Sequence, residues 1–318
     1  MRIPLVASVL LGRGLTPVLG WAQTYPQRES GQPARAAQPD QPVRLQVPVL
    51  VPRVPQQAAA PEQPPKPPFT LTPQEEAQVD RVLALWEQRN RAIKTFDCEF
   101  KRWIYDLVFS PPRPNETLRP KFVDTGVIKY AAPDRGMFRA ERTERSGAMV
   151  PIEDARSEYW ISDGKSIFEM NPSKKQLIEH QLPPELQGKS IANSPLPFLF
   201  GAESQKLKQR YYIRIVTPED VKDQIWLEAY PRNRQDAANF HHAQFIIAAQ
   251  GMAPFALKLI QPNQKDYIAY QFFNIVVNDP LRLFKGDPFR PYTPIGWTKV
   301  IDPAASSQAS RVPNDGQR

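Results

Sequence analysis

The sequence predicts a mainly β protein with some α-helix (α+β): an incomplete antiparallel β-barrel, or half-barrel, of about ten or eleven strands. Short segments with apolar residues at every second position recur through the middle of the chain, and Gly, Pro and Asn turns separate them. The strand–helix–strand alternation of a parallel sheet is missing. Some segments, such as Phe245–Ile247 and Phe272–Phe273, are apolar at successive positions. In such a strand both faces are covered, or one face lines a cavity.

Composition separates one domain from its flanks. Twelve Pro lie between Tyr25 and Pro68 without a periodic apolar pattern, so residues 23–69 are predicted to be a Pro-rich disordered linker. Residues 302–318 are predicted to be a disordered tail for the same reason. The remaining residues, 70–301, have a length that a single domain commonly has.

Residues 1–22 predict a signal peptide and therefore a periplasmic or secreted protein. Arg2 precedes the apolar run Ile3–Leu11, and Gly20–Ala22 offers the small residues of a cleavage site. Arg13 interrupts the apolar stretch, so the alternatives are a mis-assigned start or a disordered N-terminus. No other stretch approaches the ~20 apolar residues that a membrane span requires.

Charge and cysteine content exclude several classes of function. The chain carries a net charge of +8, but residues 73–300 hold only 32 Lys and Arg against 28 Asp and Glu. So small a surplus over a whole domain is weak as a footprint for nucleic acid. Cys98 is the sole cysteine, which excludes an intramolecular disulfide and a thiolate metal site.

The domain is predicted to open with an amphipathic helix. Thr72 is suited to the N-cap, Pro73 to the first helical position, and Glu75 completes a capping box. Apolar residues then fall on one face at helical spacing, and this face is predicted to pack on the sheet. These residues are Val79, Val82, Leu83, Trp86 and Ile93.

The first strand after this helix is predicted to be irregular. Its apolar residues up to Phe100 fall on one parity, and those from Trp103 onward fall on the other. The switch near Lys101–Arg102 predicts a bulge or a strong bend. Further strands are predicted at residues 126–130, 136–142, three within 158–181, 211–216, 225–230, 243–249, 255–261 and 267–277.

Three short strands between Glu158 and Gln181 are predicted to form a meander. Asp163-Gly164 is a strong hairpin signal, because Gly takes positive φ without steric cost. Asn171-Pro172 begins the second turn, in which Pro presets φ. The turn residues of this motif are Ser162, Asp163, Gly164, Asn171 and Pro172.

An apolar segment after the meander is predicted to form a short lid helix or flap. It contains Phe198 and Leu199 directly after Pro195 and Pro197. The segment is too short to span a membrane and too apolar to lie in water. We therefore expect it to press on a hydrophobic surface.

The meander resembles the Ser-Asp-Gly-Lys, Phe/Trp and Asn-Pro signature of the LolA-like periplasmic lipoprotein carriers. Ser162–Lys165, Phe168 and Asn171-Pro172 carry the match, and further short motifs from Phe96 to Gly296 agree in order. The long Pro-rich linker makes the chain similar in particular to uncharacterised secreted proteins of planctomycete bacteria.

The resemblance implies an incomplete antiparallel barrel lidded by helices, whose apolar concavity holds lipoprotein acyl chains. In the carriers an Arg stands directly before the Pro that corresponds to Pro133 and helps to hold the lid. Ala132 occupies that position here. The resemblance therefore supports a lipid-binding cavity and does not extend to a shuttle that opens and closes in the same way.

Catalytic and metal-binding signatures are missing from the sequence. The His residues are His180 and the adjacent pair His241-His242, and neighbouring His on a strand point to opposite faces. No metalloprotease, hydrolase, phosphate-loop or paired-cysteine motif is present. We therefore predict no enzyme, no cofactor and no metal site.

The sequence favours an exported half-barrel that binds an apolar ligand, the acyl chains of a lipid or lipoprotein. The alternative is an envelope scaffold or sensor module that has the same fold with a filled core and binds a protein partner. Strand parity alone does not say which face of the sheet the helix covers. Ordinary core packing therefore explains each apolar position equally well. The candidate cavity or lid residues are Ile128, Tyr130, Phe138, Trp160, Phe168, Phe198, Leu199, Phe245, Leu257 and Phe272.

Overall fold

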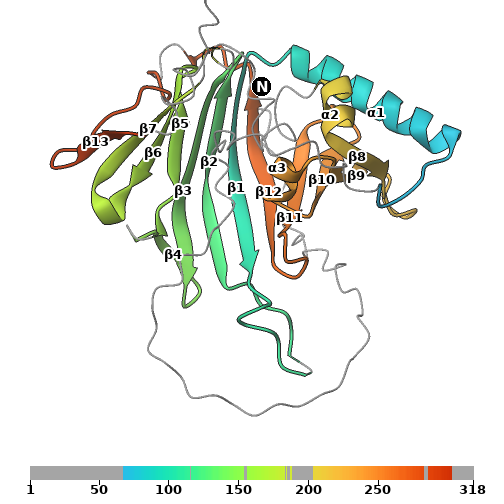
Figure 1. Cartoon of the computed structure of the whole chain (residues 1–318), viewed down its shortest axis with the longest axis horizontal. Coiled ribbons are helices and arrows are strands. Elements are labelled where there is room, and N and C mark those ends of the chain that lie inside the picture. Colours follow the sequence, from blue (N-terminus) through green and yellow to red (C-terminus); the bar gives the residue numbers. More distant parts are fainter. Residues whose placement is uncertain are drawn as a thin grey trace, which may run out of the picture. The chain divides into compact units, whose positions relative to one another are not determined.

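The structure, a computed structural model, describes residues 67–114, 116–153, 156–182, 184, 187, 203–282 and 286–302. All of these residues belong to one compact unit, Gln46–Arg318. A large curved sheet dominates it, and helix α1 (Pro73–Arg91) lies beside strand β8 at one edge (Figure 1). The predicted mainly β architecture with helices is confirmed.

The described residues form thirteen strands in a single sheet, against about ten or eleven expected from the turn spacing. The difference comes from two strands of four residues each, β4 and β13, which are too short to show the alternation that predicts a strand. The strands are β1 (Thr95–Tyr105), β2 (Phe122–Ala131), β3 (Arg135–Arg145), β4 (Ala148–Pro151), β5 (Tyr159–Ser162), β6 (Ser166–Asn171), β7 (Gln176–Gln181), β8 (Tyr211–Ile215), β9 (Gln224–Pro231), β10 (His242–Ala248), β11 (Pro254–Ile260), β12 (Tyr267–Val277) and β13 (Thr298–Ile301).

The sheet is open within the described part of the chain. Its order is β13-β7-β6-β5-β3-β2-β1-β12-β11-β10-β9-β8, with β4 beside β3, so β13 and β8 are the two edges. The β13–β7 pair is parallel, and the other described pairs are antiparallel. Short helices α2 (Ser204–Arg210) and α3 (Arg234–Ala237) flank β8 and β9.

Helix α1 begins as the sequence predicts. The side chain of Thr72 accepts a hydrogen bond from the backbone N–H of Glu75, and the Thr72 N–H donates to the Glu75 carboxylate at 2.7 Å. These two bonds satisfy groups that would otherwise lack partners in the first turn. The buried side of the helix runs through Val79, Leu83, Trp86 and Asn90.

The predicted parity switch in β1 is wrong. Burial alternates without interruption along the strand, so that Arg102 is buried between Phe100 and Ile104 while Trp103 lies on the other side. The irregularity is elsewhere, where the register with β12 shifts between Asp97 and Glu99. The prediction failed because Trp103 and Tyr105, on which it rested, lie on the half-buried side of the strand, while Arg102 takes the inward position.

The meander is confirmed as β5, β6 and β7, joined in order. Gly164 has φ of +92°, and Asp163 Oδ1 accepts from the N–H groups of Lys165 and Ser166, each at 2.8 Å. Asn171 caps a short 3-10 turn, η2 (Pro172–Lys174), by accepting from the Lys174 N–H. The side chains of Asp163 and Asn171 thus stabilise the turns by accepting hydrogen bonds from backbone N–H groups.

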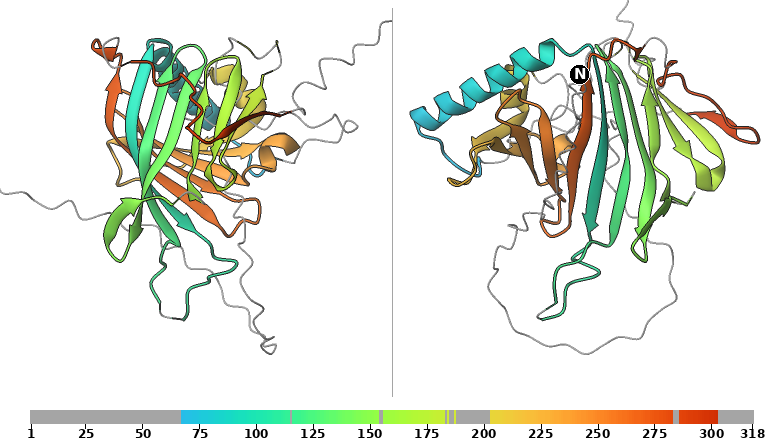
Figure 2. Two further views of the ribbon diagram at one scale, coloured as in Figure 1. Left: turned by 90° about the vertical axis from the view of Figure 1, so that its left-hand side faces the viewer. Right: turned by 180° about the vertical axis from the view of Figure 1, so that it is seen from behind.

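Buried apolar residues form two clusters on opposite faces of the sheet. The inner cluster, on the face that α1 covers, draws on α1 and on β1, β2, β3, β5 and β8–β12. The smaller outer cluster consists of Ala131, Met137, Ile161, Phe168, Leu177 and Phe289. Phe289 belongs to the C-terminal segment, which crosses the strands in Figure 2.

The described residues contain no helix whose length and hydropathy would suit a membrane span. The predicted lid segment with Phe198 and Leu199, the predicted signal peptide, most of the predicted linker and nearly all of the predicted tail lie outside the described residues.

Candidate functional site

The inner face of the sheet carries a row of stacked aromatic rings. Phe138 on β3 lies between Phe100 on β1, at a centroid distance of 4.9 Å, and Trp160 on β5, at 6.0 Å, and both pairs are stacked. Tyr270 on β12 meets the edge of Phe100 at 5.7 Å. The row therefore continues across five neighbouring strands, since β2 passes beneath it between β1 and β3.

Gly126 on β2 makes this stacking possible. It pairs with Phe100 across the β1–β2 ladder, and a Cβ atom built on it would lie 2.7 Å from the Phe100 ring and 2.0 Å from the Arg139 carbonyl oxygen. A side chain at this position would displace the ring or the neighbouring strand. The glycine is thus required by close approach, and the ring covers the strand where the side chain is missing.

A second aromatic contact joins helix α1 to strand β10 on the same inner face of the sheet. Trp86 on α1 packs against Phe245 on β10 at a centroid distance of 4.8 Å. The indole N–H of Trp86 and the side-chain amide nitrogen of Asn90 are buried without a hydrogen-bond partner, and so is the indole N–H of Trp160. Unpaired buried donors are uncommon in protein interiors and call for an explanation.

The structure brings most of the predicted cavity residues together. The inner cluster contains seven of them, each no more than 5% exposed. Phe168 instead belongs to the outer cluster, and Phe198 and Leu199 lie outside the described residues. The seven are Ile128, Tyr130, Phe138, Trp160, Phe245, Leu257 and Phe272.

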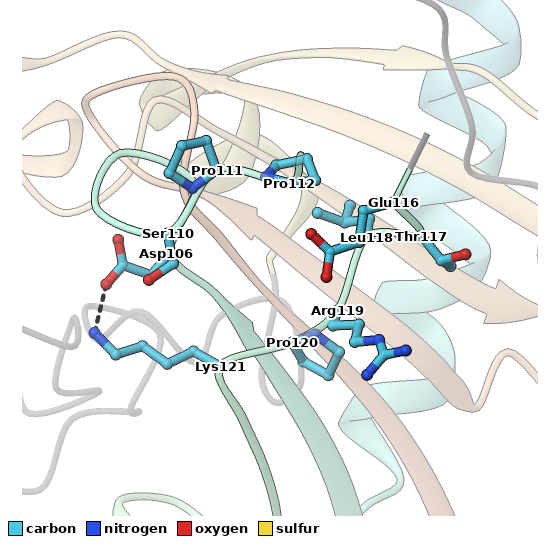
Figure 3. A pocket seen from close by; sticks show the side chains of 10 residues that line it. All are labelled: Asp106, Ser110, Pro111, Pro112, Glu116, Thr117, Leu118, Arg119, Pro120 and Lys121. Atoms are coloured by element: carbon cyan, nitrogen blue, oxygen red, sulfur yellow. Dashed lines mark hydrogen bonds and ion pairs between the residues drawn. The ribbon is translucent and has the colours of Figure 1, made fainter. Parts of the chain in front are cut away.

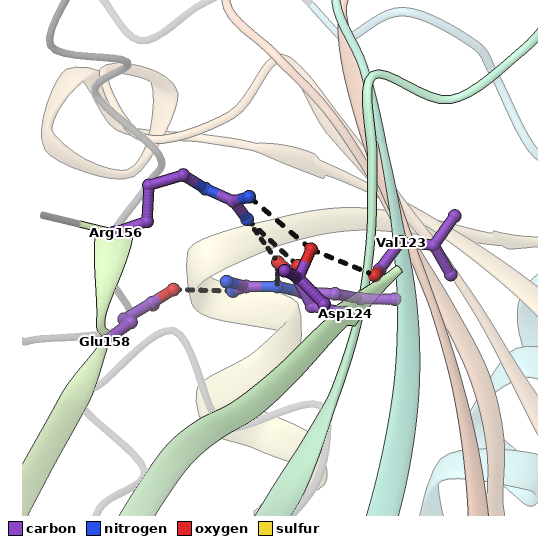
Figure 4. Close-up of polar contacts among 6 residues, drawn as sticks. Val123, Asp124, Arg156 and Glu158 are labelled. Carbon is purple, nitrogen blue, oxygen red and sulfur yellow. Dashed lines mark hydrogen bonds and ion pairs between the residues drawn. The ribbon is translucent and has the colours of Figure 1, made fainter. Parts of the chain in front are cut away.

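A group of charged side chains lies beside the aromatic row, with the Arg102 guanidinium 5.7 Å from the centroid of the Phe138 ring. We call this group the polar border, and it consists of Arg102, Asp124, Arg156 and Glu158. Figure 4 labels Asp124, Arg156 and Glu158. Arg102 Nε donates to Asp124 Oδ2 at 3.1 Å, and an Arg102 terminal nitrogen donates to Glu158 Oε2 at 2.5 Å. Arg156 holds both oxygens of Asp124 from the other side, at 2.9 and 3.2 Å. Two cations and two anions thus form a continuous chain of ion pairs.

Burial in the polar border is deep at the centre of the ion-pair chain and partial at both of its ends. The side chains of Arg102 and Asp124 are 2% and 0% exposed, whereas those of Glu158 and Arg156 are 12% and 30% exposed. Burial alone would lower the pKa of Arg102, but the negative charges of Glu158 and Asp124 outweigh it, and the pKa is raised. Burial raises the pKa of neighbouring Tyr270 to about 12. Arg102 is therefore charged and Tyr270 neutral at physiological pH.

Sequence reasoning missed the polar border, although a signal for it exists. Arg102 continues the alternation of Phe96, Cys98 and Phe100 on β1, and an arginine at an inward position requires acidic partners. Asp124 lies directly opposite Arg102 in the β1–β2 ladder. Such a pairing becomes visible once the strand register is known.

The histidines and the cysteine form no recognisable reactive site. His241 Nδ1 and His242 Nδ1 lie 2.8 Å apart, and burial lowers the pKa of His242 to about 4, so it is neutral at physiological pH. Burial also raises the pKa of the Cys98 thiol, which makes it a poor nucleophile. Among the described residues, no group of three or more His, Cys, Asp or Glu is arranged to hold a metal ion.

A hollow of about 250 Å³ lies within the loop that joins β1 to β2 (Figure 3). Two of its lining residues, Asp106 and Lys121, form an ion pair at 2.6 Å. Its walls come from this one loop, in large part from prolines and solvent-exposed polar residues. Because none of the lining residues belongs to the inner cluster, this hollow is separate from the candidate binding face.

Comparison with known proteins finds likeness in structure and none in sequence. The chain matches no family model and no curated protein. It is similar to the structure of an uncharacterised conserved protein from Thermus thermophilus, with 9% identity and a TM-score of 0.41 over 71% of this chain and 99% of that one. It is also similar to a LolA superfamily protein from Nitrosomonas europaea, with 8% identity and a TM-score of 0.32 over 67% of this chain and 99% of that one.

A third similar structure is the MucA/MucB complex from Pseudomonas aeruginosa, with 13% identity and a TM-score of 0.33 over 63% of this chain and 57% of that one. A LolA superfamily protein is thus among the structures that this chain resembles, as the sequence motifs predicted. The narrower resemblance to planctomycete proteins stays a prediction. TM-scores this low carry no argument about ligand or partner, so the proposals below rest on this chain's own residues.

Proposed function

We propose that this protein binds an apolar ligand, the acyl chains of a lipid or lipoprotein, along the inner face of its sheet, and that it catalyses no reaction. The observation that carries the proposal is the continuous apolar inner face, which runs from Trp160 on β5 to Phe245 on β10 and is overlain by α1. Burial alone supplies affinity for an acyl chain, about 0.8 kcal/mol for each CH₂ group removed from water. Such a site requires no catalytic group.

The open order of the described sheet supports this proposal. Its two edge strands, β8 and β13, are not paired with each other. The two halves of the sheet can therefore move apart without breaking a closed ladder of hydrogen bonds. The inner-cluster side chains are closely packed in this structure. A ligand would therefore enter by displacing α1 or by moving the two halves of the sheet apart.

The same packing favours a second candidate, an envelope scaffold or sensor whose inner face is a permanent core and whose surface binds a protein partner. The stacked rings of Phe100, Phe138 and Trp160 already fill the centre of the inner face. An exposed Phe109, 72% accessible in the β1–β2 loop, is one apolar side chain that a partner could cover. In both proposals the predicted signal peptide places the protein in the periplasm or outside the cell.

Mass spectrometry under native conditions, on protein purified from its own host, separates the two candidates. A lipid-binding protein is expected to retain lipid and, once stripped of it, to take up an apolar dye. Replacement of Leu257 by Trp should reduce dye uptake because Leu257 lies in the inner cluster. The matched control is replacement of Phe255 by Trp, because Phe255 lies on the same strand and is exposed, and this change should leave dye uptake unaltered. Protein that retains no lipid and takes up no dye would exclude the first candidate.

A further inference from the structure

Two buried polar atoms beside the aromatic row have no partner, although the groups around them are densely paired. They are Oε1 of Glu158 and the indole Nε1 of Trp160. The other oxygen of Glu158 is held by Arg102, so the carboxylate is fixed in place with one oxygen left over. A buried donor or acceptor without a hydrogen bond is costly, and native structures rarely keep one without a reason.

The two atoms belong to side chains on the same side of one strand. Glu158 immediately precedes β5, and Trp160 is two residues further along, which is the spacing of neighbours on one face. The Trp160 ring packs in the inner cluster, and the Glu158 carboxylate reaches the buried Arg102 on that same face. One is an unused donor and the other an unused acceptor.

Their position lies where the apolar face meets solvent. On one side are Phe138 and the rest of the aromatic row, and Phe138 is fully buried. The side chain of Glu158 is itself 12% exposed and ends the chain of ion pairs, and that of Arg156, two residues earlier in the sequence, is 30% exposed. A chain bound along the inner face would therefore have its polar end at Glu158 and Trp160. This order of apolar face, polar atoms and solvent matches the shape of an amphiphile.

The charges of the polar border select the kind of polar end. Both guanidinium groups are already paired with Asp124 or Glu158, so the four charges cancel. An anionic group would have to displace one of these carboxylates or lie beside them at a cost. An uncharged hydroxyl or amide group can accept from the Trp160 N–H and donate to Glu158 Oε1 without disturbing an ion pair.

We propose that Trp160 Nε1 and Glu158 Oε1 form the polar subsite of the inner face, and that its ligand is an uncharged amphiphile whose hydroxyl or amide group both accepts and donates a hydrogen bond. The inference rests on the proposed apolar-ligand function and adds the chemical class of the ligand. The alternative is that the polar border is a purely structural network of ion pairs, and that Trp160 Nε1 and Glu158 Oε1 bind water only.

Three probes of equal chain length test the assignment on delipidated full-length protein at pH 8. Monododecanoylglycerol both donates and accepts, methyl dodecanoate only accepts, and dodecanoate is an anion. We expect monododecanoylglycerol to bind about tenfold more tightly than methyl dodecanoate, because it alone donates a hydrogen bond to a charged acceptor. Dodecanoate is expected to bind most weakly, and competition with an apolar dye measures all three.

Two substitutions identify the atoms responsible. Trp160→Phe keeps an aromatic ring and removes the N–H. It should therefore weaken the binding of both ester probes, monododecanoylglycerol and methyl dodecanoate, by about fivefold. Glu158→Gln can keep a bond to Arg102 while its amide nitrogen replaces the unpaired oxygen, so it should abolish the preference between the esters. Glu141→Gln makes the same chemical change in a partly exposed residue that pairs with Arg139, and should alter nothing. Circular dichroism confirms that each variant is folded.

The possible results separate the subsite from the proposed function. If no probe and no dye binds, the apolar-ligand function is excluded and the subsite with it. If all three probes bind equally, or if the preference survives both Trp160→Phe and Glu158→Gln, the inner face binds apolar chains and the polar border binds water only. Tighter binding of dodecanoate would overturn the assignment to uncharged ligands.

Discussion

Phe100 and Arg102 are two residues apart on β1, point to the same side of the sheet, and are both almost inaccessible to solvent. Phe100 is stabilised by stacked neighbours and by the removal of apolar surface from water, which contributes about 25 cal/mol for each Å². Arg102 loses its hydration at large cost and recovers stability only through Asp124 and Glu158. Equal burial on one face thus rests on two opposite physical causes.

The two regions should respond differently to substitution and to a ligand. The hydrophobic stabilisation of the aromatic row is non-directional, so a ring can shift and still bury most of its surface. The polar border depends on particular pairs, and the loss of one partner leaves the other charged and buried. The inner cluster should therefore tolerate a ligand that displaces rings, while the polar border should hold one arrangement.

Replacement of Arg102 by Leu is expected to have the largest effect. It strands the Glu158 carboxylate and leaves Asp124 with Arg156 alone, so we expect a loss of about 4 kcal/mol in the free energy of unfolding. Urea denaturation followed by tryptophan fluorescence measures the loss. The double variant with Glu158→Leu as well removes the stranded charge and should recover about half of it. A cost below about 1 kcal/mol for the single variant would contradict the role of the ion pairs.

Gly126→Ala tests the apolar region in the same assay. The new methyl group would meet the Arg139 carbonyl oxygen and the Phe100 ring, and we expect a loss of about 2–3 kcal/mol from overpacking. Thr125→Ala, on the neighbouring residue of β2, should cost less than about 1 kcal/mol. An unchanged stability for Gly126→Ala would show that the aromatic row adjusts even to a clash with the backbone.

Thr72→Ala acts on the apolar region from a distance. It removes the capping box of α1, which packs on the inner cluster, and the expected loss is about 1 kcal/mol. Thr72→Ser retains the hydroxyl and should retain most of the stability. Equal losses in the two variants would show that packing of the Thr72 methyl group matters and that the cap does not.

His180 gives the smallest effect. It lies on β7, next to the edge strand β13 and outside both regions. Its Nδ1 lies 2.9 Å from Asp302 Oδ2, and its Nε2 lies 3.5 Å from Glu169 Oε2, which is within reach of an ion pair and long for a hydrogen bond. The carboxylate of Glu169, together with that of Asp302, raises the pKa of His180 above its usual 6.5 against the opposing effect of burial.

A raised pKa means that the folded protein favours protonated His180. The contribution to stability is therefore complete below the unfolded pKa of 6.5 and is lost as the pH rises through the folded pKa. Partial exposure keeps it below about 1 kcal/mol. Unfolding measured from pH 5.5 to 8.5 should show this decline, and His180→Gln should remove it. An identical pH dependence in the variant would exclude His180 as its source.

Local sequence determined the features that depend on neighbouring residues. The capping box at Thr72 and the turn at Asp163-Gly164 require only backbone geometry within a few positions, and both form as predicted. The alternation of apolar residues likewise located most of the strands. It did not locate β4 or β13, because those short strands depend on the partner that they pair with.

Only the tertiary structure decided which face of each strand became the inner one. Phe138 and Phe168 are equally apolar in sequence, yet the sheet places the first in the inner cluster and the second in the outer one. Arg102 is buried beside apolar neighbours because the register of β1 and β2 sets it opposite Asp124. The physical reason is that a residue's burial depends on what lies across the sheet from it, and that partner can be far away in the chain.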